Sequence, residues 1–270
     1  MGNLPWAAVG SGAPVVFLPG LAPVTGVAGD RTVRAMLVPA RDLARERRVF
    51  LVNRRTGLPA ELTMSELATE HAHALRSFFS GPVDLVGLST GGSIAQQLAA
   101  DHPDTVRRLV LLSSACRLGA IGREVQAAVA DQLRTGDRRR AAAAAAAAMA
   151  PTARRAAGGL GWLVGSRVFP TPAACADLVA TIAAEDGFDL ARCSRPIEAR
   201  TLIIAGARDR FYSPELFMET HALIRDSRLA LFPKRGHIGV TRDRRALAQL
   251  AGFLNFEANG RSDGHRAALR

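Results

Sequence analysis

The sequence has few cysteines, few aromatic residues and no long apolar run. Its three cysteines, Cys116, Cys175 and Cys193, are odd in number and far apart. This argues against a disulfide framework and against a metal site built on paired cysteines. No apolar run is long enough to cross a bilayer, and residues 1–10 lack the charged and then apolar order of an export signal. We therefore expect a soluble, cytoplasmic protein without a membrane span.

The chain is basic, with a formal net charge of +11, but the charge is not arranged as in a typical nucleic-acid-binding protein. Arginines occur in every part of the chain, and Lys234 is the single lysine. Aromatic residues, which would stack on bases, make up only 5% of the sequence. We therefore expect no nucleic-acid partner. The sequence carries no signal of an oligomeric state.

The 270 residues, 48% of them hydrophobic, are enough for one globular domain with a full core. Continuous apolar runs alternate with stretches that have helical periodicity. The runs that predict strands are 6–9, 15–18, 49–52, 83–87, 106–113, 201–205 and 228–232. This alternation is typical of an α/β fold, in which helices cover both faces of a mostly parallel sheet.

The pattern changes between residues 115 and 195, where alanine-rich helical stretches dominate. We predict a core of residues 1–114 and 196–258, a helical insertion of residues 115–195 and a disordered tail of residues 259–270. An insertion at this point would lie over the carboxyl ends of the strands, where open α/β sheets bind ligands, and would act as a lid. Its larger apolar residues favour a small or hydrophobic substrate; they are Leu160, Trp162, Leu163, Val164 and Phe169.

The segment 87–91, Gly-Leu-Ser-Thr-Gly, lies between an apolar strand and a helix. The pattern Gly-x-Ser-x-Gly occurs by chance in many proteins, but the strand–turn–helix context is the one that a nucleophile elbow requires. The elbow would expose the hydroxyl of Ser89. The backbone N–H of Thr90, at the start of the helix, would point to the position where an oxyanion develops.

Two further reactive residues follow later strands: Asp209 comes after the run 201–205, and His237 after the run 228–232. Nucleophilic acyl chemistry needs a serine, an imidazole that takes and returns its proton, and a carboxylate that orients the imidazole. Asp209 could instead cap a helix, and Asp84 or Asp186 could supply the acid. However, Asp84 begins a strand at the wrong end, and Asp186 lies in the insertion.

The other histidines are less suitably placed, because each falls within or at the end of a helix or in the tail. None of them has metal-site spacing. They are His71, His73, His102, His221 and His265.

In this combination of motifs the chain resembles the α/β-hydrolase superfamily, from about residue 10 to residue 254. The matching segments are 18–21 (Leu-Pro-Gly-Leu), 87–92 (Gly-Leu-Ser-Thr-Gly-Gly), 206–209 (Gly-x-x-Asp) and 236–237 (Gly-His). Two segments depart from the family pattern. Pro19 stands where the family usually has a histidine, and residues 53–57 replace a loop that is usually acidic and rich in glycine.

The resemblance implies an α/β-hydrolase fold with a helical lid, and a role for each site residue. Ser89 would be the nucleophile, His237 the general acid and base, and Asp209 the acid that orients the histidine. The backbone N–H groups of Leu21 and Thr90 would form the oxyanion hole.

The nucleophile limits the possible reactions. Haloalkane dehalogenases and epoxide hydrolases of this fold use aspartate at the elbow, so Ser89 argues against both. We expect a serine hydrolase that forms an acyl-enzyme on a small-molecule substrate, first of all a carboxylic ester, and that needs no cofactor or metal. Hydrolysis of amides, lactones, thioesters or carbon–carbon bonds, acyl transfer, and a ligand-binding protein without turnover remain alternatives.

Overall fold

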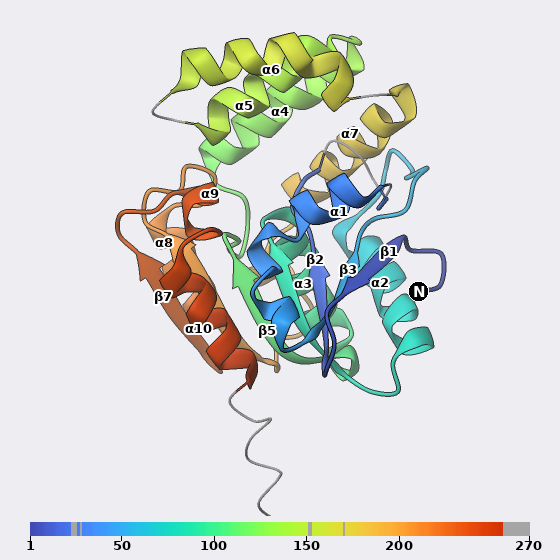
Figure 1. Ribbon diagram of the computed structural model, residues 1–270, viewed down its shortest axis with the longest axis vertical. Coiled ribbons are helices and arrows are strands. Elements are labelled where there is room, and N and C mark those ends of the chain that lie inside the picture. Colours follow the sequence, from blue (N-terminus) through green and yellow to red (C-terminus); the bar gives the residue numbers. More distant parts are fainter. Residues whose placement is uncertain (23–25, 28, 151–152, 170, 256–270) are drawn as a thin grey trace, which may run out of the picture.

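The computed structural model describes residues 1–22, 26–27, 29–150, 153–169 and 171–255 (Figure 1). The predicted tail of residues 259–270 lies outside these ranges. In the described residues, seven strands form one sheet in the order β1-β3-β2-β4-β5-β6-β7. Strand β1 is antiparallel to β3, and the other neighbouring pairs are parallel. The strands are β1 Trp6–Val9, β2 Pro14–Leu18, β3 Arg48–Val52, β4 Val83–Leu88, β5 Val106–Leu112, β6 Arg200–Gly206 and β7 Ser227–Phe232.

Helices cover both faces of this sheet, and each strand therefore buries its side chains on both sides. Leu85 of β4 packs into the core cluster that includes α2 (Met64–Phe78), α3 (Thr90–Asp101) and α8 (Pro214–Leu223). Its neighbour Val86 packs into the cluster on the other face, with α1 (Asp30–Met36) and α10 (Arg244–Asn255). This double burial explains why the strands are continuous apolar runs in the sequence, and it confirms the predicted fold class.

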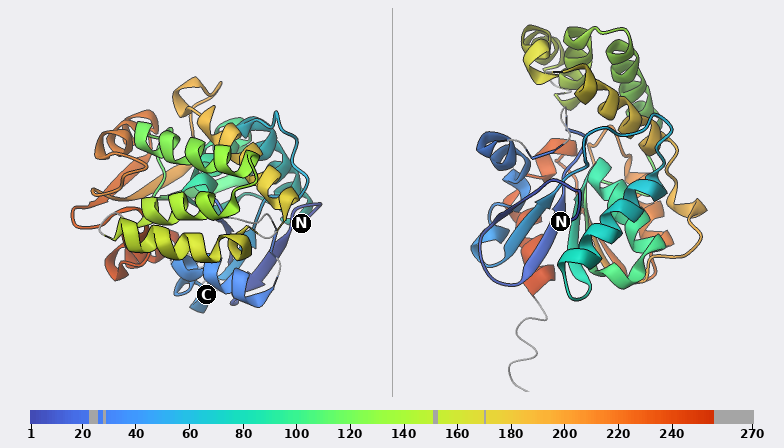
Figure 2. Two further views of the ribbon diagram at one scale, coloured as in Figure 1. Left: turned by 90° about the horizontal axis from the view of Figure 1, so that it is seen from above. Right: turned by 90° about the vertical axis from the view of Figure 1, so that its right-hand side faces the viewer.

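Helices α4 (Ala120–Arg134), α5 (Arg138–Met149), α6 (Arg154–Val168) and α7 (Pro172–Asp186) follow β5 in the chain. Helices α4, α5 and α6 lie side by side above the carboxyl ends of the strands, and α7 leads back toward the sheet (Figures 1 and 2). They share a separate hydrophobic cluster that includes Val129, Leu133, Phe169, Leu178 and Ile182. No helix in the described residues has the length and apolarity to span a membrane.

The largest side chains of α6 do not face this cluster, although the sequence analysis took them as apolar residues of a lid that favour a small or hydrophobic substrate. Leu160, Trp162 and Leu163 are exposed, whereas Phe169 is buried. The reason is that α6 packs on the alanine run of α5 through glycines: a Cβ on Gly161 would lie 2.5 Å from the carbonyl oxygen of Ala142. Only the smallest residues fit this contact, so the large side chains lie on the outer face of the helix.

Asp84 lies at the amino end of β4, buried among three arginines. It accepts hydrogen bonds from Arg47 at 2.5 Å, from Arg107 at 2.7 and 2.9 Å and from Arg108 at 2.8 and 2.9 Å. Burial alone would raise the pKa of this carboxyl, but the hydrogen bonds and charges of Arg108 and Arg107 lower it overall. Arg47 also donates to the carbonyl oxygen of Leu254 at the end of α10. Asp84 therefore ties the amino edge of the sheet to α10.

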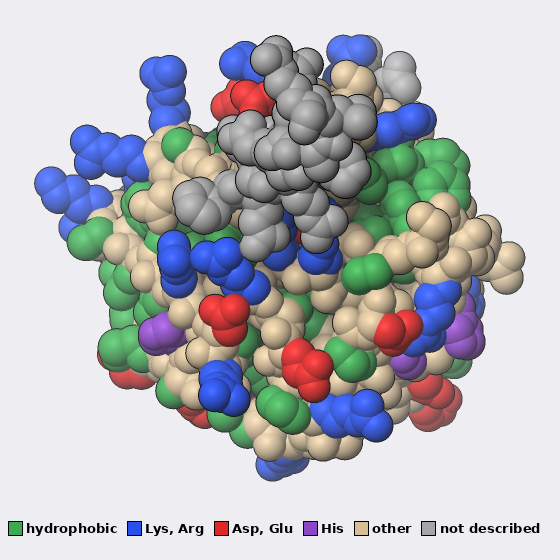
Figure 3. Space-filling view, turned by 90° about the horizontal axis from the view of Figure 1, so that it is seen from below, with side chains coloured by type: hydrophobic (Ala, Val, Ile, Leu, Met, Phe, Trp, Pro, Cys, Tyr) green, Lys and Arg blue, Asp and Glu red, His purple; other side chains and the backbone are tan. Residues whose placement is uncertain are grey.

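The end of the molecule opposite helices α4, α5 and α6 has a mixed charge distribution. In the view from below, Lys and Arg side chains are scattered among acidic and uncharged ones around the grey atoms (Figure 3). On this visible face, the positive charge of the chain is spread out and interrupted by carboxylates.

His71 of α2 is buried, and its ring nitrogen Nδ1 lies 2.7 Å from the carbonyl oxygen of Leu67. Burial, which disfavours the imidazolium, lowers the pKa of His71 from 6.5 to about 4. The imidazole is therefore neutral in the folded protein at neutral pH.

We expect His71 to make folding stability depend on pH between about 6.5 and 4. The His71 imidazole takes up a proton near pH 6.5 in the unfolded chain but only near pH 4 in the folded protein. The contribution of His71 to the free energy of unfolding is therefore complete above pH 6.5 and is lost as pH falls, by about 3 kcal/mol in total. Urea unfolding at pH 7.5, 6 and 5 measures this slope. His71→Gln, which has no titrating group here, should have a flatter slope over this interval. Equal slopes in the two proteins would contradict the assignment.

Candidate active site

Ser89 is located at the sharp turn between β4 and α3. Its backbone has φ 51° and ψ −123°, a conformation that non-glycine residues rarely adopt. The turn is held by hydrogen bonds on both sides of the residue: Ser89 N–H donates to the carbonyl oxygen of Leu112 at 3.0 Å, and Gly92 N–H donates to that of Ser89 at 2.7 Å. This is the strained strand–turn–helix geometry expected of a nucleophile elbow.

Glycines make the elbow possible because there is no space for a side chain beside it. A Cβ on Gly87 would lie 2.6 Å from the carbonyl oxygen of Gly91, and a Cβ on Gly91 would lie 2.3 Å from that of Leu18. Strand β4, helix α3 and the segment after β2 therefore pack backbone against backbone around Ser89.

The structure brings together the three residues that the sequence predicted as a reactive group. His237, the first residue of α9 (His237–Val240), places Nε2 3.1 Å from Ser89 Oγ and Nδ1 2.7 Å from Asp209 Oδ2. Asp209 follows β6, and its other oxygen, Oδ1, accepts the backbone N–H groups of Phe211 at 2.8 Å and Tyr212 at 3.3 Å. A carboxylate held in this way keeps a proton on Nδ1 and leaves Nε2 free to accept the proton of the serine.

The imidazole is also fixed by its neighbours. The ring centroids of Phe211 and Tyr212 lie 4.8 and 5.9 Å from that of His237. Ser113 at the end of β5 donates a hydrogen bond to the backbone carbonyl of His237 at 2.9 Å. These contacts restrain both the ring and the main chain of the histidine.

One predicted oxyanion residue follows Ser89 in the chain, and the other belongs to a segment that passes beside Ser89. Thr90 is the next residue and the first of α3. The segment that contains Leu21 passes close by, because a Cβ on Gly20 would lie 3.3 Å from Ser89 Cβ. Pro19, which replaces the usual histidine, is part of the same segment and leaves this close approach in place.

The rival acids are not near the histidine. Asp84 is at the opposite edge of the sheet, bound by arginines, and Asp186 at the end of α7 lies 4.0 Å from Arg123. Among the other histidines, His102 and His221 contact Thr69 and Ser227. His265 lies outside the described residues.

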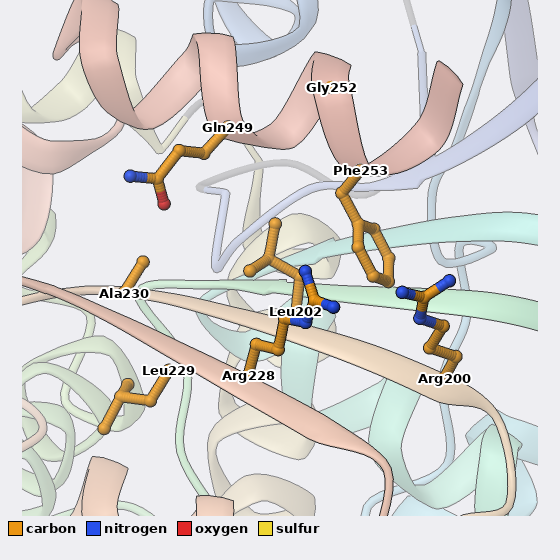
Figure 4. A pocket seen from close by; sticks show the side chains of 8 residues that line it. All are labelled: Arg200, Leu202, Arg228, Leu229, Ala230, Gln249, Gly252 and Phe253. Carbon is orange, nitrogen blue, oxygen red and sulfur yellow. The ribbon is translucent and has the colours of Figure 1, made fainter. Parts of the chain in front are cut away.

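A hollow of about 160 Å³ adjoins His237. It is bordered by Phe211 and Ile238, by Arg208 and Arg210, and by Met149 at the end of α5. A larger hollow of about 510 Å³ lies elsewhere, between α10 and strands β6 and β7, where Arg200 and Phe253 border it (Figure 4). Arg200 begins β6, so this hollow is near the amino end of that strand, away from Ser89.

Two buried charged residues near the site were missed by the sequence analysis. Glu185 of α7 is fully buried and contacts Thr90, and Arg54 follows β3 and is buried close to Glu185. A signal for Glu185 was present. Asp177, Thr181 and Glu185 recur every four residues and form a polar stripe on a helix whose other residues before Asp186 are apolar.

Proteins of known function or structure resemble this chain. Pimeloyl-[acyl-carrier protein] methyl ester esterase of Neisseria meningitidis serogroup C is 27% identical over 171 residues, which is 62% of this chain and 66%, just under two thirds, of that protein. The crystal structure of the enol-lactonase from Burkholderia xenovorans has a TM-score of 0.71 at 22% identity, with 94% of this chain and 96% of that chain covered. An esterase from Exiguobacterium antarcticum has a TM-score of 0.71 at 20% identity, with 96% and 100% covered. The two structures show the same fold.

The model of the alpha/beta hydrolase family matches residues 15–250, which include all strands except β1 and the first residue of β2, the elbow, and the segments that carry the acid and the histidine. The match covers most of the sequence. The chain therefore belongs to the alpha/beta hydrolase family.

Proposed function

We propose that this enzyme is a serine hydrolase that cleaves carboxylic esters through an acyl-enzyme. The observation that carries the proposal is the position of the His237 imidazole, which lies within hydrogen-bond distance of both Ser89 Oγ and Asp209 Oδ2. Serine, imidazole and carboxylate in this order are the groups that activate a hydroxyl at neutral pH.

In the proposed reaction, Ser89 Oγ attacks the ester carbonyl carbon while His237 Nε2 takes its proton. The carbonyl oxygen becomes an oxyanion that accepts hydrogen bonds from the N–H groups of Leu21 and Thr90. The C–O bond to the leaving alcohol breaks as His237 returns the proton to it. Water then attacks the acyl-enzyme carbonyl carbon as His237 Nε2 takes its proton. The bond from this carbon to Ser89 Oγ breaks as His237 returns the proton to Oγ, which releases the carboxylic acid. Asp209 orients the imidazole and stabilises its charged form throughout.

Helices α4 to α7 are proposed to serve as the lid of this site, in line with an insertion of residues 115–195 into a core of residues 1–114 and 196–258. Their position above the carboxyl ends of the strands supports this role (Figure 1). Met149 of α5 borders the hollow beside His237 together with Phe211 and Ile238. These three apolar side chains support a small or hydrophobic acyl group, and Arg208 and Arg210 border the same hollow.

The names of similar proteins support ester cleavage over the other reactions of this fold. One relative is described as a methyl ester esterase, one structural neighbour as an esterase and another as an enol-lactonase, which acts on a cyclic ester. All three names describe attack on an ester carbonyl.

The test is covalent labelling followed by turnover. A fluorophosphonate should add one equivalent to the purified protein, on the peptide that contains Ser89, and Ser89→Ala should remain unlabelled. A series of p-nitrophenyl esters from acetate to octanoate then measures acyl preference, and added alcohols or amines distinguish hydrolysis from acyl transfer. Folded protein that takes no label between pH 6 and 9 would refute the proposal.

A further inference from the structure

We propose that Glu185 is a positioning residue of this site and that Arg54 balances its buried charge. From helix α7, Glu185 holds the elbow at Ser89 and the loop that contains Asp209 in fixed positions relative to each other. This inference rests on the proposed function. No sequence motif assigns a role to either residue, and neither is one of the reacting groups.

Glu185 is fully buried and accepts hydrogen bonds from four side chains of the described residues. Oε2 accepts from Thr90 Oγ1 at 2.7 Å and from Gln126 Nε2 at 2.8 Å. Oε1 accepts from Tyr212 OH at 3.0 Å and from Ser93 Oγ at 3.1 Å. A carboxylate is suited to this place because it only accepts hydrogen bonds and has about four positions for donors.

These donors come from separate parts of the chain. Thr90 and Ser93 are on the elbow helix α3, Gln126 is on α4, and Tyr212 is in the loop after β6. A single side chain of α7 thus connects two insertion helices with the helix that follows Ser89 and with the loop that contains the acid.

Two of the donors are in direct contact with the proposed catalytic groups. Thr90 follows the nucleophile and supplies a proposed oxyanion N–H. Tyr212 donates its backbone N–H to Asp209 Oδ1, and its ring stacks on His237. Burial and the neighbouring Glu185 raise the pKa of the Tyr212 phenol well above its usual value. The phenol therefore keeps its proton and donates a hydrogen bond to Glu185. Glu185 therefore restrains both the residue that follows Ser89 and a residue that contacts Asp209 and His237.

Arg54 explains how a carboxylate can be buried here. Its guanidinium is buried, and burial lowers its pKa from 12.5 to about 10, which leaves it charged at neutral pH. The negative charges of Glu185 and Asp177 attract it electrostatically. Its two terminal nitrogens have no hydrogen-bond partner in the described part of the chain. Arg54 thus acts on Glu185 through its charge and not through a direct hydrogen bond.

The test compares Glu185→Gln with Asp177→Asn in the full-length protein. Both variants remove one negative charge of α7 beside Arg54. However, Asp177 accepts from the backbone N–H groups of Gly57 and Leu58, whereas Glu185 accepts from Thr90 and Tyr212. The readouts are kcat and KM for p-nitrophenyl acetate, the rate of fluorophosphonate labelling of Ser89, and the melting temperature.

Glu185→Gln should lower kcat and the labelling rate about 10- to 100-fold, because the new amide group donates where the carboxylate accepted and shifts Thr90 and Tyr212. KM should stay within about twofold of the wild-type value. Asp177→Asn should lower the melting temperature at least as much and leave kcat within about twofold. Unchanged kcat in Glu185→Gln, or an equal loss in Asp177→Asn, would overturn the inference.

Tyr212→Phe decides the question if Glu185→Gln does not fold. It removes one phenol O–H, while the backbone N–H that binds Asp209 remains. We expect kcat to fall about fivefold with little change in melting temperature, and an unchanged kcat would overturn the inference. Wild-type protein without label or turnover would instead refute the proposed function, so the two failures are distinguishable.

Discussion

Ser89→Ala should lower kcat for a p-nitrophenyl ester by about 10⁴- to 10⁶-fold, because no other group can form the acyl-enzyme. His237 would then have no hydroxyl to deprotonate, although the oxyanion donors and the binding surface would remain. The activity left should therefore exceed that of water alone and show no burst of released nitrophenol.

The measurement is steady-state and burst kinetics of the variant beside the wild-type protein, with circular dichroism to verify the fold. Ser80→Ala is a suitable control, since Ser80 is an exposed serine in the turn between α2 and β4. It should retain full activity. A Ser89→Ala variant that keeps more than about a hundredth of wild-type kcat would show that the serine is not the nucleophile.

Asp209→Asn should lower kcat by about 10⁴-fold with little change in structure. The reason lies in the backbone N–H groups of Phe211 and Tyr212, which point at Oδ1 of the native aspartate. In the variant, the amide oxygen is expected to stay with these donors, which turns the NH₂ group toward Nδ1 of His237. An amide that donates to Nδ1 leaves the proton on Nε2, and the imidazole then has no lone pair for the serine.

Asp186→Asn provides the control for this experiment. Asp186 is the rival acid in the insertion, and its side chain is solvent-exposed near Arg123. The control should have wild-type kcat. Asp209→Asn activity within tenfold of wild type, or a large loss in Asp186→Asn, would assign the orienting acid to a different residue.

Local sequence signals were enough to predict the sheet and the three residues that meet at its carboxyl edge. The strands are recognisable because both of their faces are buried, which leaves runs such as Leu109–Leu112 without polar interruption. Ser89 was recognisable because its neighbouring glycines leave a pattern in five consecutive positions. The fold class is confirmed, whereas the roles of Ser89, Asp209 and His237 remain predictions that rest on their observed proximity.

Features that depend on contacts between distant segments could not be predicted in this way. The outward orientation of Leu160 and Trp162 follows from glycines of α6 that meet the backbone of α5, a pairing that helical periodicity does not reveal. The partners of Glu185 come from α3, α4 and the loop after β6, so no local pattern identifies them as a group. Such networks are specified by tertiary packing.

The close packing at Gly87 and Gly91 also restricts how the specificity of this enzyme can evolve. Any side chain at these positions would collide with backbone atoms, which cannot move aside without displacing Ser89. Substitutions of these two glycines are therefore expected to displace Ser89, so these positions offer little variation for new substrates. We expect changes in substrate specificity to arise instead at positions such as Met149 and Ile238, which border the hollow beside His237 and lie outside the elbow. Related enzymes that differ in substrate should accordingly differ first in the insertion helices and the loop after β7.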